Sequence, residues 1–336
     1  MRVFKIIYDF FCLGSFDFSF HGYFRMPCNK YNKVDKLIGH LFPEDSMRMG
    51  YILKCFSFFF IVLVLTSCVR QKETIRIGLL PIPDALPFIV AKHNNFFDNQ
   101  NVEVELVFFK SAQERDAAYQ AKKIDCALVD PVIVLLMEKA GIEIKPIFAI
   151  TGSKKSGKGR LAILSAPRDL GQKGLGLAPY CIVDYVADCL LKANPLAPSW
   201  ERILIPNISL RLTMLLENQI AAAVLTDPYI DYALEGGANI VIEDTGLYEI
   251  VFAASNSIMK KYPGWFQQLS PIFDRAVELI NSEPEAFKDT LVHFCSIDKK
   301  FAERVELPQF HDAHPSDTLK GQAIYDWIDL ERERLP

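Results

Sequence analysis

The sequence lacks the excess of positive charge that marks nucleic-acid-binding proteins, because 37 Lys and Arg residues face 41 Asp and Glu residues. A surface that binds nucleic acid needs clustered Lys and Arg side chains, which replace the counterions on phosphates. The segment after residue 67 is more acidic still, with 29 basic and 36 acidic side chains. We therefore expect no nucleic-acid partner.

Paired CxxC units, the usual signature of a structural zinc site, are also missing from the sequence. Four of the eight cysteines follow residue 68, namely Cys126, Cys181, Cys189 and Cys295. Cys181 and Cys189 are expected about two turns apart on one helix, which is too far for a disulfide bond. We interpret the four mainly as buried, small apolar residues, with a disulfide or redox role as the alternative. We expect no metal site and no cofactor.

A complete phosphate-binding loop is absent as well. Gly152 to Lys158 fits the GxxxxGK pattern, but Gly159 follows where the loop needs Ser or Thr for magnesium. The next residues, Arg160 to Ser165, are predicted to form a strand, whereas the motif requires a helix. We therefore reject ATP binding.

The apolar run from Phe56 to Leu65 is shorter than the about 20 residues that a membrane-spanning helix needs. Arg48 and Lys54 precede the run, and it ends in Leu-Thr-Ser-Cys68, an aliphatic residue, two small residues and a cysteine. This order is typical of a bacterial lipoprotein signal peptide. We predict that residues 47–67 are removed and that Cys68 becomes a lipidated N-terminus, for example by palmitate. An uncleaved anchor or a buried core helix is the alternative.

Such a signal places the protein outside the cytoplasm, in the periplasm or at the cell surface, with the lipid on Cys68 as its membrane anchor. Residues 68–74 form a charged, polar tether. Residues 1–46 are crowded with aromatic side chains in neither a helical nor a strand period, and we interpret them as an over-extended start or a disordered segment. Translation from Met47 or Met49 puts the basic residues at the N-terminus; a cytoplasmic tail is the alternative.

From residue 75 onwards, predicted strands alternate with predicted helices. Strands are expected at 75–80, 102–109 and 125–129, with helices at 86–97, 112–122 and 131–139. A second set of strands is expected at 174–178, 202–205, 221–225 and 239–242. Strands separated by single helices build a parallel sheet with helices on both faces. The predicted fold class is therefore α/β with two lobes, each a mainly parallel sheet flanked by helices.

Two crossings are expected to divide the chain between the lobes. Residues 75–155 form lobe 1, residues 156–248 form lobe 2, and residues 249–336 return to lobe 1 and form C-terminal helices, one of which begins at Pro271. The crossings are expected at Thr151 to Gly159, which is rich in glycine and small residues, and at Glu249 to Ser255.

An Asp-Pro pair recurs at Asp130-Pro131 and Asp227-Pro228, each time between a predicted strand and a predicted helix. Asp is a good helix N-cap, and Pro is tolerated at the first helical position. Both pairs are therefore expected to cap helices. They also lie at the carboxyl ends of parallel strands, the edge at which open α/β sheets bind ligands.

Several short motifs in this order resemble one known family. After the lipoprotein signal come Ile75-Arg-Ile-Gly-Leu, His93-Asn-Asn-Phe-Phe97, Ile124-Asp-Cys-Ala-Leu, Asn281-Ser-Glu-Pro-Glu-Ala286 and Tyr325-Asp-Trp327. Together they resemble the substrate-binding lipoproteins of ABC importers, in the branch that includes binding proteins for thiamine pyrimidine precursors, alkyl sulfonates, taurine and nitrate. The resemblance implies a monomer with a type II periplasmic-binding-protein fold and no enzymatic activity. Such a protein closes two lobes on a small ligand and delivers it to a membrane permease, whose ATPase lies on other chains.

Loops at the carboxyl ends of the strands face the cleft in such a fold. The candidate ligand-binding residues in these loops are Pro83, Asp84, Ser111 and Asp130 in lobe 1 and Tyr180, Cys181, Asp227 and Tyr229 in lobe 2. Asp84 and Ser111 are equally candidates for turn or cap residues. The two tyrosines are candidates for stacking on a planar ligand with their hydroxyls in water, or for ordinary packing.

Aspartates outnumber Lys110 in these loops, which favours a ligand with amine groups, such as a thiamine pyrimidine precursor. Helix N-termini at the same loops leave an oxyanion of the sulfonate, taurine or nitrate type as the alternative. An enzyme is the alternative from another class, because Cys181 is expected at a helix N-terminus, which lowers a thiol pKa. The branch resembles an enzyme that makes the thiamine pyrimidine, but the cysteine-rich, CCCFC-like stretch of that enzyme is missing here.

Overall fold

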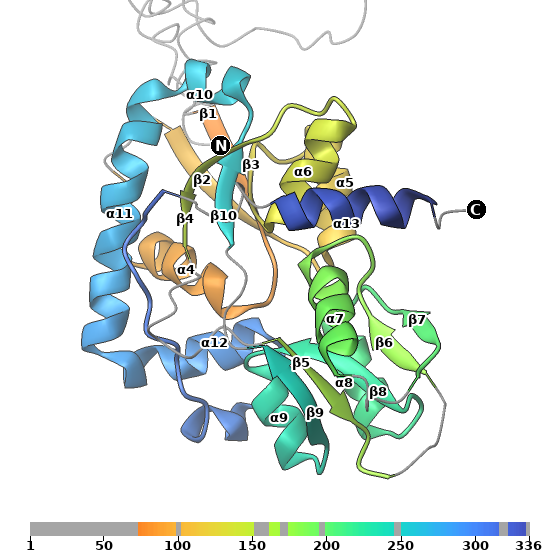
Figure 1. The fold of residues 1–336 in the computed structure, drawn as a ribbon. Coiled ribbons are helices and arrows are strands. Elements are labelled where there is room, and N and C mark those ends of the chain that lie inside the picture. Colours follow the sequence, from red (N-terminus) through yellow and green to blue (C-terminus); the bar gives the residue numbers. More distant parts are fainter. Residues whose placement is uncertain are drawn as a thin grey trace, which may run out of the picture. The chain divides into compact units, whose positions relative to one another are not determined.

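The computed structural model describes residues 73–98, 102–150, 161–168, 174–194, 199–244, 250–315 and 322–333, which all belong to one compact unit (Figure 1). Residues 1–46, the predicted signal peptide, Cys68, the tether up to residue 72 and the predicted crossing at 151–159 lie outside these ranges. Within the described ranges, no helix is both long and apolar enough to span a membrane.

The first sheet has the strand order β2-β1-β3-β10-β4. Its strands are β1 (Glu73–Leu79), β2 (Val102–Phe108), β3 (Cys126–Val129), β4 (Lys145–Ala149) and β10 (Val251–Ala254). β1 is parallel to β2 and β3, whereas β10 is antiparallel to β3 and β4. β3 and β10 are buried along their whole length, as expected for central strands covered on both faces. The region expected to be only a return crossing thus supplies a strand.

Helices follow the strands of the first sheet. α4 (Leu86–His93) follows β1 after a short 3-10 turn, η1 (Pro83–Ala85), while α5 (Ala112–Gln120) follows β2 and α6 (Pro131–Lys139) follows β3. Phe252 of β10 stacks between Phe88 of α4 and Phe148 of β4, with ring centroids 5.4 Å apart in both pairs. These rings lie in the apolar core between the sheet and its helices.

The second sheet repeats this architecture with the strand order β7-β6-β8-β5-β9. Its strands are β5 (Leu161–Ser165), β6 (Leu175–Leu177), β7 (Arg202–Leu204), β8 (Ala222–Thr226) and β9 (Asn239–Asp244), and its helices are α7 (Ile182–Ala193), α8 (Ile208–Leu216) and α9 (Tyr229–Glu235). In each sheet one strand, β10 or β5, runs against the other four. The predicted two-lobed α/β fold with mainly parallel sheets is confirmed.

The C-terminal part is helical, as predicted. It comprises α10 (Asn256–Lys261), α11 (Pro263–Ser282), η2 (Pro284–Phe287), α12 (Lys288–Phe294), η3 (Lys299–Glu303) and α13 (Gln322–Glu333). The prediction that a helix begins at Pro271 is wrong, because Pro271 lies inside α11. Buried Trp265 and Leu269 before the proline continue the apolar face of Ile272 and Phe273 after it. Burial of this continuous face outweighs the hydrogen bond that proline removes.

The two Asp-Pro turns differ. Asp130 caps α6 as predicted, because its side chain accepts a hydrogen bond from the backbone N–H of Ile133. The prediction that Asp227 caps the next helix is wrong. α9 begins only at Tyr229, Pro228 occupies the N-cap position without a side-chain cap, and the Asp227–Pro228 peptide is cis. A matching dipeptide therefore does not guarantee a matching helix start.

Candidate ligand-binding site

A cavity of about 80 Å³ lies between loops of the two sheets. Its walls include Leu80 and Pro81 after β1, Lys110 to Ala112 after β2, Asp130 after β3, Ala178 and Cys181 after β6, Pro206 after β7 and Thr226 at the end of β8. All of these strands belong to the parallel part of their sheets, and the lining residues lie at their carboxyl ends. This is the edge at which α/β sheets bind ligands.

Three of the predicted ligand-binding residues line this cavity, namely Ser111, Asp130 and Cys181. The other five, Pro83, Asp84, Tyr180, Asp227 and Tyr229, are not among its lining residues. Pro83 and Asp84 are buried within the 3-10 turn η1. The aspartates that line the cavity are thus fewer than the sequence suggested.

Asp130 is the acidic group of the cavity, and it is only 4% exposed. Burial raises the pKa of its carboxyl group to about 6, although Arg115 and the N–H of Ile133 act in the opposite direction. The hydrogen bond from Ile133 to the carboxylate is 3.1 Å long. Asp130 is therefore close to its protonation midpoint under mildly acidic conditions, and it can accept or donate hydrogen bonds.

Ser111 and Cys181 stand before helices that begin at the cavity. The Ser111 hydroxyl accepts a 3.2 Å hydrogen bond from the N–H of Glu114 and caps α5, as predicted. Cys181 is buried, and its Sγ lies 3.4 Å from the carbonyl oxygen of Ala178. Burial raises the pKa of this thiol to about 12, which outweighs the effect of the helix N-terminus. The expectation of a lowered thiol pKa is wrong, and Cys181 is not an activated nucleophile.

The two predicted tyrosines have different environments. Tyr229 is fully buried, and its hydroxyl lies 2.9 Å from the carbonyl oxygen of Pro81 and 3.0 Å from that of Cys295. It therefore connects α9 of the second sheet to a loop of the first, with its hydroxyl away from water. Tyr180 is 39% exposed and has a positive φ of 58°. Its backbone N–H donates a hydrogen bond to Asp184.

Two buried arginines, which the sequence did not reveal as site residues, also line the cavity. Arg115 and Arg211 are each 2% exposed, and each follows a capping residue, Ser111 or Asn207, by one helical turn. Each donates to a backbone carbonyl 13 residues further along the chain, Leu128 for Arg115 and Val224 for Arg211. The repeated pattern of a cap and an arginine one turn later was the available signal.

The two arginines differ in charge compensation. Arg115 Nε donates a 2.8 Å hydrogen bond to the carboxylate of Asp116, and Nη2 lies 2.7 Å from the same oxygen without hydrogen-bond geometry. Arg211 donates to the carbonyls of Val224, Ile205 and Pro206. Among the described residues no carboxylate forms an ion pair with it, and burial lowers the pKa of Arg211 to about 10. Arg211 is thus a buried cation at the cavity wall that is held by neutral groups.

Comparison with known proteins agrees with this architecture. The family model described as "NMT1/THI5 like" matches residues 82–287. The chain belongs to the NMT1/THI5-like family. The family resemblance predicted from the sequence is confirmed. No curated protein sequence matches the chain.

Solved structures similar to this NMT1/THI5-like chain include binding proteins for sulfonates and for nitrate. The alkanesulfonate-binding protein SsuA of Xanthomonas axonopodis has a TM-score of 0.64 and 15% identity, covering 79% of this chain and 94% of that one. The aliphatic sulphonate-binding protein SsuA of Escherichia coli has a TM-score of 0.60 and 16% identity, covering 78% and 92%. The nitrate-binding protein NrtA of Synechocystis has a TM-score of 0.56 and 12% identity, covering 74% and 75%. At these identities the similarity establishes the fold.

The region that matches the NMT1/THI5-like family model contains most of the cavity wall, including Arg115, Asp130 and Arg211. The last helix, α13, lies beyond the matched residues.

Proposed function

We propose that this protein is the extracytoplasmic substrate-binding component of an ABC importer. It binds a small molecule between its two sheets and delivers it to a membrane permease, whose ATPase lies on other chains; it acts as a binding protein without catalysis. The observation that supports this proposal is the cavity whose walls come from the strand ends of both sheets. A ligand that touches both sides favours the closed arrangement through its contacts with each.

A sulfonate or a substituted pyrimidine enters when the two sheets have moved apart, and the loops then close around it.

The charges of the cavity wall favour a ligand with an anionic group. Arg211 is a buried cation without an ion-pair partner among the described residues, and buried charges are costly unless they are paired. The N-termini of α5, α6, α7 and α8 also begin at the cavity, and helix N-termini attract anions. We therefore place an oxyanion ligand of the sulfonate, taurine or nitrate type ahead of the amine-bearing pyrimidine precursor. An amino sulfonate such as taurine carries both an anionic group that suits Arg211 and an amine that suits Asp130.

Isothermal titration calorimetry of the purified protein with taurine, nitrate and the hydroxymethyl pyrimidine precursor of thiamine tests this proposal. Arg211→Lys keeps the positive charge but loses the planar fork of donors. It should weaken the binding of the anionic ligand by about ten- to hundredfold, the value of a lost charge-assisted hydrogen bond. Arg275→Lys is the matched control, because the guanidinium of Arg275 lies over the Phe96 ring and outside the cavity wall.

The outcomes separate the two ligand classes. Binding of the pyrimidine alone, with an affinity that depends on Asp130 and is unchanged in Arg211→Lys, would assign the amine-bearing class. If none of the three binds, and mass spectrometry finds no small molecule retained by the purified protein, the substrate-binding proposal itself fails.

We also propose that the mature protein begins at Cys68 and is held at the membrane by lipid on that residue. The support is the order of basic residues, apolar run and Leu-Thr-Ser-Cys in the sequence. The mature chain, from Cys68 onwards, acts as a monomer. In this arrangement the tether leaves the two sheets free to open and close next to the permease.

A further inference from the structure

The helix α13 contacts helices that belong to different sheets. On one side, Lys139 of α6 forms an ion pair with Asp329 of α13, and its ammonium lies 5.7 Å from the centre of the Tyr325 ring. On the other side, Trp327 packs edge-on against Tyr185 of α7, with ring centroids 5.6 Å apart. Figure 1 shows α13 lying across α6 and next to α7. α6 follows β3 of the first sheet, and α7 follows β6 of the second.

A buried polar contact fixes the α7 side of this helix. The indole Nε1 of Trp327 donates a 2.8 Å hydrogen bond to Oδ2 of Asp188, and both residues are buried. Hydrogen bonds to a carboxylate are stronger than neutral ones. Ile324 and Ile328 of α13 are buried as well. The helix is therefore packed into the molecule by an apolar face and an oriented hydrogen bond.

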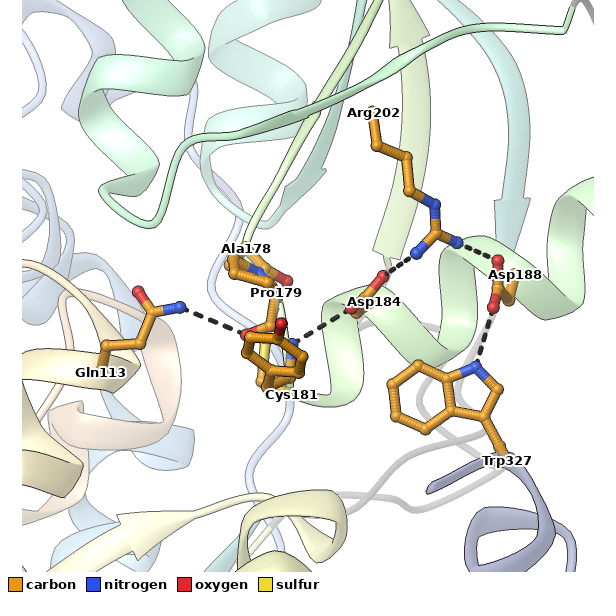
Figure 2. Close-up of polar contacts among 9 residues, drawn as sticks. Gln113, Ala178, Pro179, Cys181, Asp184, Asp188, Arg202 and Trp327 are labelled. Carbon is orange, nitrogen blue, oxygen red and sulfur yellow. Dashed lines mark hydrogen bonds and ion pairs between the residues drawn. The ribbon is translucent and has the colours of Figure 1, made fainter. Parts of the chain in front are cut away.

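The same carboxylate begins a polar network that includes Arg202 and Asp184 (Figure 2). Arg202 of β7 pairs with Asp188 and with Asp184, which both lie on α7. Asp184 in turn accepts a 3.1 Å hydrogen bond from the backbone N–H of Tyr180. Tyr180 belongs to the segment Ala178–Cys181, and both ends of this segment line the cavity. We call this segment the cavity loop.

The first sheet also holds the cavity loop directly. Gln113 of α5 donates a 3.4 Å hydrogen bond to the carbonyl oxygen of Pro179. The cavity loop is thus held on one side by Gln113 of α5 and on the other by Asp184. Arg202 links Asp184 to Asp188. Since Asp188 is also the acceptor of the Trp327 hydrogen bond, α13 and the cavity wall share one set of contacts.

We propose that α13 is a strap between the two sheets that holds α6 against α7 and, through the Asp188–Arg202–Asp184 network, keeps the cavity loop in the position seen in the structure. The strap contributes free energy to this arrangement of the two sheets in the absence of ligand and has to loosen when the sheets move apart. Its role in ligand release rests on the proposed function. The mechanical coupling between α13 and the cavity loop does not.

Hydrogen–deuterium exchange of the full chain, measured without ligand, tests the coupling. Trp327→Phe keeps an aromatic ring but removes the indole N–H. It should speed amide exchange at least tenfold in two regions: in α13, and in the cavity loop together with the first turn of α7. A tenfold change corresponds to about 1.4 kcal/mol. Trp265→Phe is the matched control, because Trp265 is equally buried and its Nε1 has no hydrogen-bond partner among the described residues. It should leave both regions unchanged.

Two further variants keep the test decisive if Trp327→Phe folds poorly. Lys139→Gln removes the charge that binds the α6 side of the strap, at a partly exposed position, and should speed exchange in the same two regions. Arg202→Lys keeps the charge but cannot bridge two carboxylates as a guanidinium does, and it should loosen the cavity loop while α13 stays protected. Faster exchange in α13 with an unchanged cavity loop, in either Trp327→Phe or Lys139→Gln, would overturn the proposal. A ligand-binding assay plays no part in this test, so failure of the proposed function leaves its result intact.

Discussion

Asp130 combines two demands that conflict at neutral pH. As the N-cap of α6 its carboxylate accepts a backbone hydrogen bond, but burial at the cavity raises its pKa from 3.8 to about 6. Arg115 and Asp116 are the charged groups that face it, with opposite effects on this pKa. Between these two pKa values the folded protein binds more protons than the unfolded chain, so the free energy of unfolding falls as the pH rises through this window.

Asp130→Asn should remove this pH dependence, because Asn caps a helix about as well as Asp and does not ionise. Relative to the Asn variant, the wild type should lose up to about 3 kcal/mol of stability between pH 4 and pH 7. Urea denaturation of both proteins at pH 4, 5.5 and 7 measures the difference. An equal gap at all three values would show that the folded-state pKa of Asp130 is close to that of the unfolded chain.

At the residue scale, the sequence allowed prediction of positions that follow from strand ends. Ser111, Asp130 and Cys181, which were predicted because they follow parallel strands, line the cavity, whereas Asp227, predicted on the same ground, does not. Arg115 and Arg211 were missed, because arginine is mostly exposed in proteins and α5 carries several charged residues. Their burial depends on carbonyls 13 residues away, which no local pattern reveals.

At the scale of elements, regular local patterns were predicted well and long-range pairing was not. α6 was predicted with its observed bounds, Pro131–Lys139, because a cap, a proline and an apolar run coincide there. The segment of β10 was expected to be a crossing between the lobes. It forms a strand because it pairs with β3 and β4, which are far away in the sequence. Likewise, α11 continues through Pro271 because tertiary burial outweighs a local signal.

Replacing glycine by alanine is expected to have opposite effects on stability at two positions, one before β6 and one in α11. Gly174, just before β6, has a φ of +94°, and a Cβ there would lie 2.8 Å from the carbonyl oxygen of Glu201. Gly174→Ala should therefore cost about 2 kcal/mol or more. Gly264 lies in the first turn of α11 with open space around it, and Gly264→Ala should add about 0.5 to 1 kcal/mol. Thermal unfolding of the two variants distinguishes them; a neutral Gly174→Ala would show that the loop before β6 can rearrange.

At the scale of the whole molecule, the two sheets are held together by contacts outside the sheets themselves. Tyr229 connects α9 to the Pro81 loop, Gln113 reaches the cavity loop, and α13 contacts both α6 and α7. The proposed opening has to break or stretch these contacts. Their combined free energy therefore sets the equilibrium between the open and closed arrangements on which a ligand acts.

The proposed lipid anchor concerns the whole chain, and Cys68→Ala tests it. Without the thiol no lipid can be attached, so the variant should remain an unprocessed precursor or appear in the soluble fraction, because acyl chains supply the membrane affinity. Fractionation of cells followed by intact-mass analysis checks this, with Cys55→Ala as the matched control. A wild-type protein without lipid whose mature chain begins near Met1 would contradict the prediction.

The strand order of the first sheet has a consequence for how the protein is made. β4 lies at the edge of this sheet, and its neighbour there is β10. The whole second sheet, from β5 to β9, is translated between these two strands. During synthesis β4 therefore lacks its partner until residue 254 of the 336 has been added. The first sheet cannot be completed before the strands of the second have been made. Such late, non-local closure slows folding, and under the proposed export it would leave the chain time to pass through a membrane channel while it is still unfolded.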